Sequence, residues 1–305
     1  MNKNNINKIA ESKDWTNIIE INEGFEKTKK YYFLKNNKKY ILKIFSTELL
    51  EKKKKEYTIL KQIQKVKFLK PKPITIKKIN GVEEYYYILT WIEGVTLTKY
   101  VKQKNMKELY RIGRKIGDII SEIHKERFDK ADLTSKIRKI ENKIPKFKEI
   151  KINGVKETVD FLEKNYMELI KQPKSIIHGD INPENIIIDD KENIGIIDFG
   201  NSDIDYSYQD MHQVQMYTRF LSIEVSAGII DSYIKMKNIN YFWKCYKIYS
   251  AYYCLSKIIW SEQFNDSSLR EDMIKRAKQT IIDFNYFKSE IPQWYIDYKK
   301  RNNEI

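Results

Sequence analysis

Cysteine is scarce in this chain, and long apolar runs are absent. The two cysteines, Cys245 and Cys254, share one segment and lie too far apart for a metal-ligand pair. Because this usage fits a reducing compartment, we expect a cytoplasmic protein. No run of about eighteen apolar residues occurs, which excludes an ordinary membrane-spanning helix. The polar stretch over residues 1–15 also has no apolar core of the kind that a secretory signal requires.

Acidic residues are outnumbered by basic ones. The chain has 57 Lys and Arg against 42 Asp and Glu, a formal net charge of +15. An anionic partner is one interpretation, and a basic nucleic-acid-binding protein is the non-enzyme alternative. However, lysines are spread along the whole length, and the run 52–55 between Glu51 and Glu56 is typical of a solvated helix. No zinc-finger spacing, RNA-recognition motif or basic tail is present, so we expect no nucleic-acid partner.

Glycine and proline are also few, at 10 and 6 residues, and neither an internal repeat nor a low-complexity linker is visible. Hydrophobic residues make up 41% of the chain and aromatic residues 13%, which suffices to fill a globular core. This composition excludes disorder over most of the chain. Because 305 residues exceed the usual length of one domain, we expect two lobes.

The first ninety or so residues alternate strand-like runs with one helix. Residues 31–34 and 40–45 flank a turn centred on Asn36–Asn37, which predicts an antiparallel hairpin. A helix is expected over 48–64, and a further strand over 84–91.

The remainder of the chain is mainly helical in pattern. Isoleucines recur at helical spacing over residues 112–123 and predict a core helix. Short strands are expected among the helices, over residues 175–177, 185–189 and 194–198. We therefore predict an α+β protein with a β-rich domain over residues 1–92 and a helical domain over residues 93–305.

The densest chemical signal combines a carboxylate, an amide and a second carboxylate. Asp180 follows His178–Gly179, Asn185 comes a few residues later, and Asp198 precedes Phe199–Gly200. Phosphoryl transfer needs a carboxylate that orients the attacking hydroxyl and oxygen ligands for Mg²⁺. We expect Asp180 to be the catalytic carboxylate and Asn185 and Asp198 to be metal ligands. If the flanking strands pair as a hairpin, Asn185 falls nearly opposite Asp198.

These motifs resemble those of the aminoglycoside phosphotransferase family, which also includes choline-type kinases. The resemblance implies a bilobal protein-kinase-like fold, with a β-rich N-lobe and a mainly helical C-lobe. It implies a Mg²⁺-dependent kinase that moves the γ-phosphoryl group of ATP or GTP to an alcohol. It also implies that Lys43 pairs with the α- and β-phosphates, that Glu56 holds this lysine, and that backbone groups of Thr90 and Ile92 bind adenine.

Two segments depart from the patterns of related kinases. The loop that covers the phosphates, residues 24–29, offers one glycine, so backbone amides and Thr28 are expected to cradle the phosphates. After Phe199–Gly200, the Gly-Asp-Pro segment of many relatives is missing, and Asp210 is expected to support the catalytic loop as a structural acid. No Ala-Pro-Glu motif follows, which argues against a protein kinase.

The sequence contains the least information about which hydroxyl is the acceptor. Our leading hypothesis is an aminoglycoside O-phosphotransferase of the antibiotic-resistance type. The alternative is a metabolic kinase of the same fold that acts on choline, ethanolamine, homoserine or a sugar. Aminoglycosides are polycations, so acidic side chains of the second lobe are candidates for binding them. These candidates are Asp203, Asp205, Glu224, Asp231 and Glu262.

Overall fold

The computed structural model describes residues 3–22, 28–235 and 237–302. The chain forms two compact units: Met1–Val95 together with Ile187–Ser202, and Thr96–Ile186 together with Asp203–Ile305. The first is rich in β-structure and the second is mainly helical, as the sequence predicts. Among the described residues, no helix is both long and apolar enough to cross a membrane.

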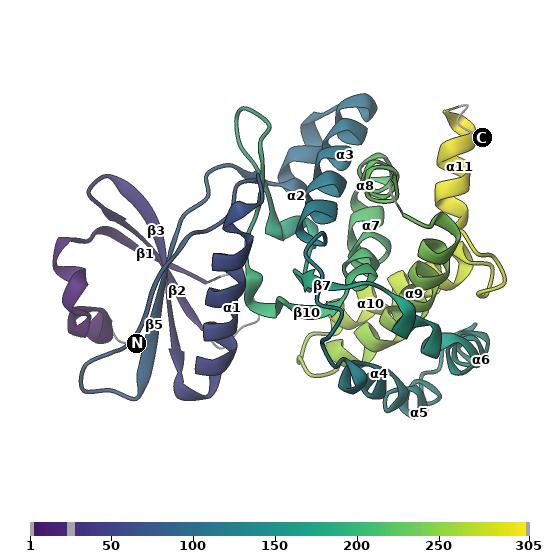
Figure 1. The fold of residues 1–305 in the computed structure, drawn as a ribbon, viewed down its shortest axis with the longest axis horizontal. Helices are drawn as coiled ribbons and strands as arrows, with labels where there is room; N and C mark the ends of the chain where they lie inside the picture. Colours follow the sequence, from purple (N-terminus) through teal and green to yellow (C-terminus); the bar gives the residue numbers. More distant parts are fainter. Residues whose placement is uncertain (1–2, 23–27, 236, 303–305) are drawn as a thin grey trace. The chain divides into compact units, whose positions relative to one another are not determined.

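The first unit is built on a five-stranded sheet with the strand order β1-β2-β3-β5-β4, along which helix α1 runs (Figure 1). Strands β2 and β3 form the predicted hairpin. Its turn residues, Asn36 and Asn37, have φ angles of 48° and 56°, the left-handed conformation that asparagine tolerates best after glycine. The bounds in this unit are β1 (Thr16–Ile21), β2 (Lys29–Lys35), β3 (Lys38–Ser46), α1 (Leu50–Gln62), β4 (Pro73–Lys78), β5 (Glu84–Thr90) and β9 (Ile194–Ile196), with β6 (Val95–Thr96) and β8 (Ile186–Ile188) at its edges.

Successive side chains of β3 point to opposite faces of the sheet, so apolar residues occupy one face and Lys43 the other. Leu42 and Ile44 are buried in an apolar cluster with Ile9 and Trp15, which flank the N-terminal 3₁₀ helix Ala10–Asp14. Lys43, between them in sequence, points to the opposite face, where it contacts α1. The sheet thus holds a charged side chain on a rigid central strand.

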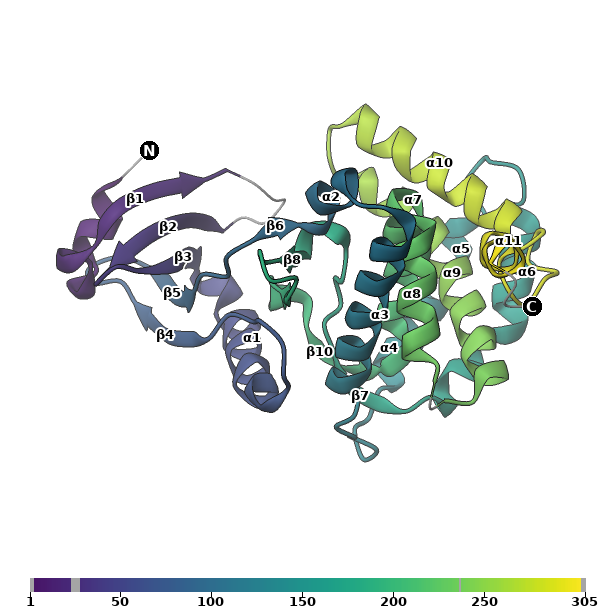
Figure 2. The same cartoon turned by 90° about the horizontal axis from the view of Figure 1, so that it is seen from above.

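The second unit packs helices α3, α8 and α9 beside one another (Figures 1 and 2). A Cβ atom on Gly113 of α3 would overlap the carbonyl group of Val225 in α8, so glycine permits the close approach of these helices. Helix α3 begins with a capping box formed by Asn105 and Glu108. The bounds are α2 (Leu97–Tyr100), α3 (Met106–Ile123), α4 (Thr134–Glu141), α5 (Ile144–Phe147), α6 (Val155–Asn165), α7 (Arg219–Leu221), α8 (Ile223–Tyr233), α9 (Ile239–Ser261), α10 (Ser267–Asp283) and α11 (Gln293–Arg301).

A short antiparallel ribbon in the second unit positions the loop that contains Asp180. Strand β7 (Lys174–Ile177) pairs with β10 (Asp203–Tyr206), and Ile177 lies opposite Asp203. The loop follows β7 directly and ends in a 3₁₀ turn, Pro183–Asn185, which the side chain of Asn182 caps. Both ends of this loop are therefore fixed by regular structure.

Candidate active site

Lys43 lies at the centre of a cluster of charged side chains in the first unit. Its side chain is buried, and its ammonium nitrogen lies 3.1 Å from Oε1 of Glu56 and 3.0 Å from Oδ1 of Asp198. A buried lysine needs such carboxylate partners to remain charged. The structure thus brings together three residues that the sequence analysis selected, from β3, from α1 and from the segment after β9.

Glu56 is held by a second lysine that the sequence analysis placed wrongly. The run 52–55 was expected to be solvated, but Lys53 is fully buried and its Nζ atom lies 3.2 Å from Oε2 of Glu56. The reason is helical geometry: Lys53 and Glu56 are three residues apart and share the face of α1 that is turned inward. Each carboxylate oxygen of Glu56 therefore accepts a hydrogen bond from a different lysine.

Asp198 has an unusual backbone and a strongly positive environment. Its φ angle is 61°, in the left-handed region that few non-glycine residues adopt. Lys30 lies 3.5 Å from its second carboxylate oxygen. The positive charge of Lys43, with a further contribution from Lys30, holds the pKa of Asp198 far below its usual range, although burial opposes this shift. Asp198 is therefore a fixed carboxylate anion, the kind of oxygen ligand that Mg²⁺ prefers.

The segment predicted to bind adenine has little spare hydrogen-bonding capacity at Thr90. Its amide donates to the carbonyl of Lys72 at 3.0 Å, and its hydroxyl accepts from the amide of Lys72 at 2.8 Å. An adenine contact at this residue therefore falls to its carbonyl group. Within the described part of the chain, no hydrogen bond involves the backbone of Ile92. Gly94 then has a φ angle of 133°, and a Cβ atom there would overlap the carbonyl of Ile188.

The loop predicted to cover the phosphates lies mostly outside the described residues, since 23–27 are not described. Thr28, near its end, is buried, and its hydroxyl has no hydrogen-bond partner among the described residues. A buried hydroxyl without a partner costs free energy. Thr28 therefore retains the capacity to bond a ligand.

In the second unit, three side-chain amides surround the carboxylate of Asp180. Asn182 donates to Oδ1 at 3.0 Å, and Gln213 reaches the same oxygen at 3.4 Å. Asn185 donates to the backbone carbonyl of Asp180 at 2.9 Å and to Oδ2 at 3.3 Å. Neutral donors orient the carboxylate without neutralising its charge. The side-chain oxygen of Asn185 is not used in these bonds.

Asp210 stabilises the same loop by hydrogen bonds to its backbone, as expected. It is buried, and its carboxylate accepts from the amides of His178 and Gly179 at 2.8 and 2.7 Å. His124 Nε2 lies 3.1 Å from it, and the other ring nitrogen of His124 lies 2.8 Å from the hydroxyl of Tyr233. Burial lowers the pKa of His124, so the ring is neutral and donates through Nε2. His178 is buried too and accepts from the Asp180 amide.

The five acidic candidates for acceptor binding lie in different parts of the second unit, and most have protein partners. Lys136 pairs with both Asp203 (2.7 Å) and Asp205 (3.1 Å). Asp231 accepts from Tyr110, Tyr295 and Lys299, which ties α8 to α3 and α11. Glu224 accepts a hydrogen bond from the hydroxyl of Ser222, and Glu262 forms an ion pair with Arg270.

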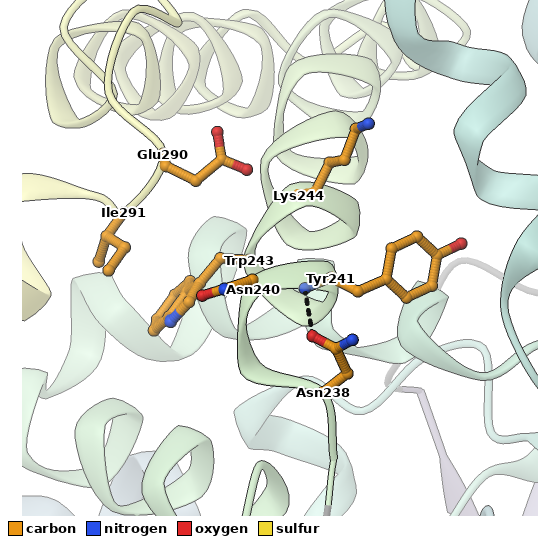
Figure 3. Close-up of a pocket in the computed structure, with 7 residues that line it drawn as sticks. All are labelled: Asn238, Asn240, Tyr241, Trp243, Lys244, Glu290 and Ile291. Carbon is orange, nitrogen blue, oxygen red and sulfur yellow. Dashed lines mark hydrogen bonds between the residues drawn. The ribbon is translucent and has the colours of Figure 1, made fainter.

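Two cavities of the second unit have linings that contain no residue of the predicted site. One, of about 580 Å³, lies where α9 begins and is bordered by Glu290 and Ile291 from the C-terminal region (Figure 3). Its lining includes Asn238, whose side chain caps α9 by accepting from the amide of Tyr241. The other, of about 490 Å³, lies between the α4–α5 segment and the end of α9.

Sequence reasoning missed Lys30, Lys53 and Gln213. The position of Lys30 was predictable from the sequence. A two-residue turn at Asn36–Asn37 fixes the hairpin register, which places Lys30 opposite Lys43. For Gln213 no local signal exists, because its partner Asp180 is far away in the sequence.

Comparison with known proteins gives the family of this chain and structures of similar fold. The profile of the phosphotransferase enzyme family matches residues 17–241. The GDP complex of a mutant aminoglycoside 2'-phosphotransferase IIIa has a TM-score of 0.70 at 14% identity, and the match covers 94% of this chain and 97% of that one. The gentamicin complex of APH(2")-IIa has a TM-score of 0.66 at 15% identity, covering 92% and 96%.

An apo thermostable mutant of APH(4)-Ia is a third similar structure, with a TM-score of 0.67 at 13% identity over 88% of this chain and 94% of that one. A search of curated proteins finds no match. The similarity of structure confirms the predicted protein-kinase-like fold. Because the family profile spans most of the sequence, the chain belongs to the phosphotransferase enzyme family.

Proposed function

We propose that this protein transfers the γ-phosphoryl group of ATP or GTP to a hydroxyl group of a small molecule. The observation that carries the proposal is the position of Lys43, whose ammonium group is bonded to both Glu56 and Asp198. Phosphotransferases of the kinase type need a lysine held in this way beside a metal-binding aspartate. Structures with similar folds contain ADP, GDP or AMP-PNP, which supports a nucleotide donor.

In this mechanism the oxygen of the acceptor hydroxyl attacks the γ-phosphorus. The bond between that phosphorus and the β–γ bridging oxygen breaks, and the diphosphate leaves. Asp180 orients the hydroxyl and accepts its proton, while Asn182 and Gln213 hold its carboxylate in position. Lys43 neutralises charge on the α- and β-phosphates. Thr28 bonds phosphate, and the carbonyl of Thr90 and the backbone of Ile92 bind the purine.

Asp198 and the unused amide oxygen of Asn185 are the residues that would hold Mg²⁺. Both are hard oxygen donors, and the lowered pKa of Asp198 keeps its carboxylate ionised. When bound, the ion would neutralise negative charge on the β- and γ-phosphates. The lysines beside Asp198 fit this role, since they keep a carboxylate charged at a partly buried position.

Aminoglycosides are the first acceptor class to test. Similar folds include complexes with gentamicin, kanamycin and streptomycin. The acids proposed for a cationic acceptor are Asp203, Asp205, Glu224, Asp231 and Glu262. A metabolic alcohol is the second class, and one observation favours those members of it that carry no positive charge: the cavity between the α4–α5 segment and the end of α9 is lined by cations.

The test is Mg²⁺-dependent release of nucleoside diphosphate, with ATP and GTP, against aminoglycosides, choline, homoserine, sugars and sugar phosphates. Asp180→Asn is the matched control, since it preserves size but cannot accept the proton. Release that one acceptor class stimulates, and that the variant loses, supports the proposal. Stimulated release that persists in Asp180→Asn contradicts it.

A further inference from the structure

The cavity between the α4–α5 segment and the end of α9 is positively charged. Arg138, Lys139, Lys143 and Lys146 line one side, and Trp260 lines the other. No Asp or Glu belongs to its lining. With a volume of about 490 Å³, it has the size of a small-molecule site.

The cations of this cavity lack acidic partners. Among the described residues, no carboxylate forms an ion pair with any of the four. The acids nearby are engaged elsewhere: Asp132 accepts from the backbone and hydroxyl of Thr134, and Glu262 pairs with Arg270. The four positive charges therefore have no directly paired carboxylate in the described part of the chain, although the charge of Arg138 helps to lower the pKa of Asp132.

Lys143 carries most of the argument because it is only partly exposed. Its ammonium group donates to the neutral hydroxyl of Ser256 at 2.8 Å and lies 5.6 Å from the ring of Tyr252. Burial, followed by the charges of Lys139, Lys257 and Lys146, lowers the pKa of Lys143. These charges repel one another, so a bound anion would relieve an unfavourable arrangement.

Helix α9 contacts residues next to the Asp180 site and also residues that line the cavity. Gln213, which donates to Asp180, follows His212, and the ring of His212 stacks on Tyr253 at 3.4 Å. Tyr253 is adjacent to Tyr252, which Lys143 contacts. On the same helix, Lys257 lies 5.0 Å from the ring of Trp260. Helix α9 therefore supplies both the ring that stacks on His212, next to Gln213, and the ring that Lys143 contacts.

We propose that this cavity binds the phosphate group of an acceptor that is itself a phosphorylated polyol. The proposal rests on the proposed function and selects the second acceptor class. A phosphomonoester carries a charge of about −1.5 to −2 at pH 7, which suits several converging cations. Lysine serves phosphate as a point charge, and Trp260 offers a flat face to the carbon skeleton. A polycationic aminoglycoside would be repelled here, since charges within roughly 8 Å are not screened.

The experiment compares the protein with the double variant Lys139→Gln, Lys143→Gln. Lys156→Gln is the matched control, because Lys156 is exposed on α6 and does not line the cavity. Diphosphate release is measured with sugar phosphates, with the same sugars unphosphorylated, with carboxylated alcohols and with aminoglycosides. We expect release with sugar phosphates only, and a KM for them at least tenfold higher in the double variant but unchanged in the control.

Binding is measured separately, so that failure of the cavity and failure of the chemistry are distinguished. Asp180→Asn is titrated with the same sugar phosphates and with inorganic phosphate, with Trp260 fluorescence as the signal. If sugar phosphates bind saturably and the double lysine substitution abolishes this binding, the cavity proposal is supported even without transfer. In that case the proposed transfer reaction is wrong. Transfer to neutral, carboxylated or cationic acceptors with an unchanged KM in the double variant overturns the cavity proposal. Absence of phosphate binding overturns it equally.

Discussion

The ammonium nitrogen of Lys53 lies 3.2 Å from Oε2 of Glu56, one helical turn away on α1, and both side chains are buried. The other oxygen of the same carboxylate accepts from Lys43. Glu56 therefore positions Lys43 only while Lys53 fixes Glu56. This makes Lys53 a supporting residue of the proposed nucleotide site.

Replacing Lys53 by Met should lower the free energy of unfolding by roughly 2 kcal/mol. The loss is smaller than for an isolated buried pair, because Glu56 keeps Lys43 as a partner. The KM for nucleotide should rise several-fold as Glu56 and Lys43 lose their fixed geometry. Chemical denaturation and steady-state kinetics measure both effects. Lys54→Met is the control: this neighbour is exposed, so little should change. Equal behaviour of the two variants would contradict the role given to Lys53.

Asp180→Asn should reduce transfer by at least 10²-fold, because the amide cannot accept the hydroxyl proton. Nucleotide affinity should stay within about twofold of the native value, since Asp180 is not assigned to nucleotide binding. Calorimetric titration with a non-hydrolysable nucleotide gives the affinity, and single-turnover kinetics give the rate. Transfer near the native rate would show that the proton goes elsewhere.

Gln213→Leu separates a positioning role from a structural one. Gln213 donates to Asp180, but its own side-chain oxygen is buried without a partner in the described part of the chain. Removing that oxygen removes an unsatisfied polar atom, so the melting temperature should not fall. The turnover number should nevertheless drop about tenfold or more, with an unchanged KM for nucleotide. A lower melting temperature with unchanged turnover would make Gln213 merely structural.

Stability at acid pH should depend on Glu11. Hydrogen bonds from Lys77 and then Tyr86 lower the pKa of Glu11 from 4.5 to about 2. Its contribution is therefore fully present above about pH 5 and is lost as pH falls toward 2. Glu11→Gln should cost roughly 1 kcal/mol at pH 7, a value reduced by partial exposure, and the difference should shrink below pH 4.5. Urea titrations at several pH values measure it. A difference that is constant with pH would contradict the shifted pKa.

The sequence predicted those features that follow from local chemistry. Asn36–Asn37 indicates a hairpin because few residues accept two left-handed conformations in succession. The loop proposed to be catalytic stands out in the sequence because its residues follow one another. Asp210 was identified as a structural acid, and its bonds to the amides of His178 and Gly179 agree with that expectation.

Features that depend on distant partners were not predictable. Lys53 looks like its exposed neighbours in the sequence, and only the packing of α1 shows which lysine is buried. Asp231 read as a candidate for binding cations, yet Tyr110, Tyr295 and Lys299 already bond it from other helices. Composition also concealed the cationic cavity, since its lysines come from one short segment in a lysine-rich chain.

The left-handed backbone of Asp198 has a consequence for the choice of mutants. At φ 61°, most substitutions change backbone strain as well as side-chain chemistry. Asparagine tolerates this conformation about as well as aspartate, whereas alanine does not. Asp198→Asn therefore removes the negative charge alone, while Asp198→Ala also strains the turn before Phe199–Gly200. An alanine scan would overstate the electrostatic importance of this position, and the comparison of the two variants measures by how much.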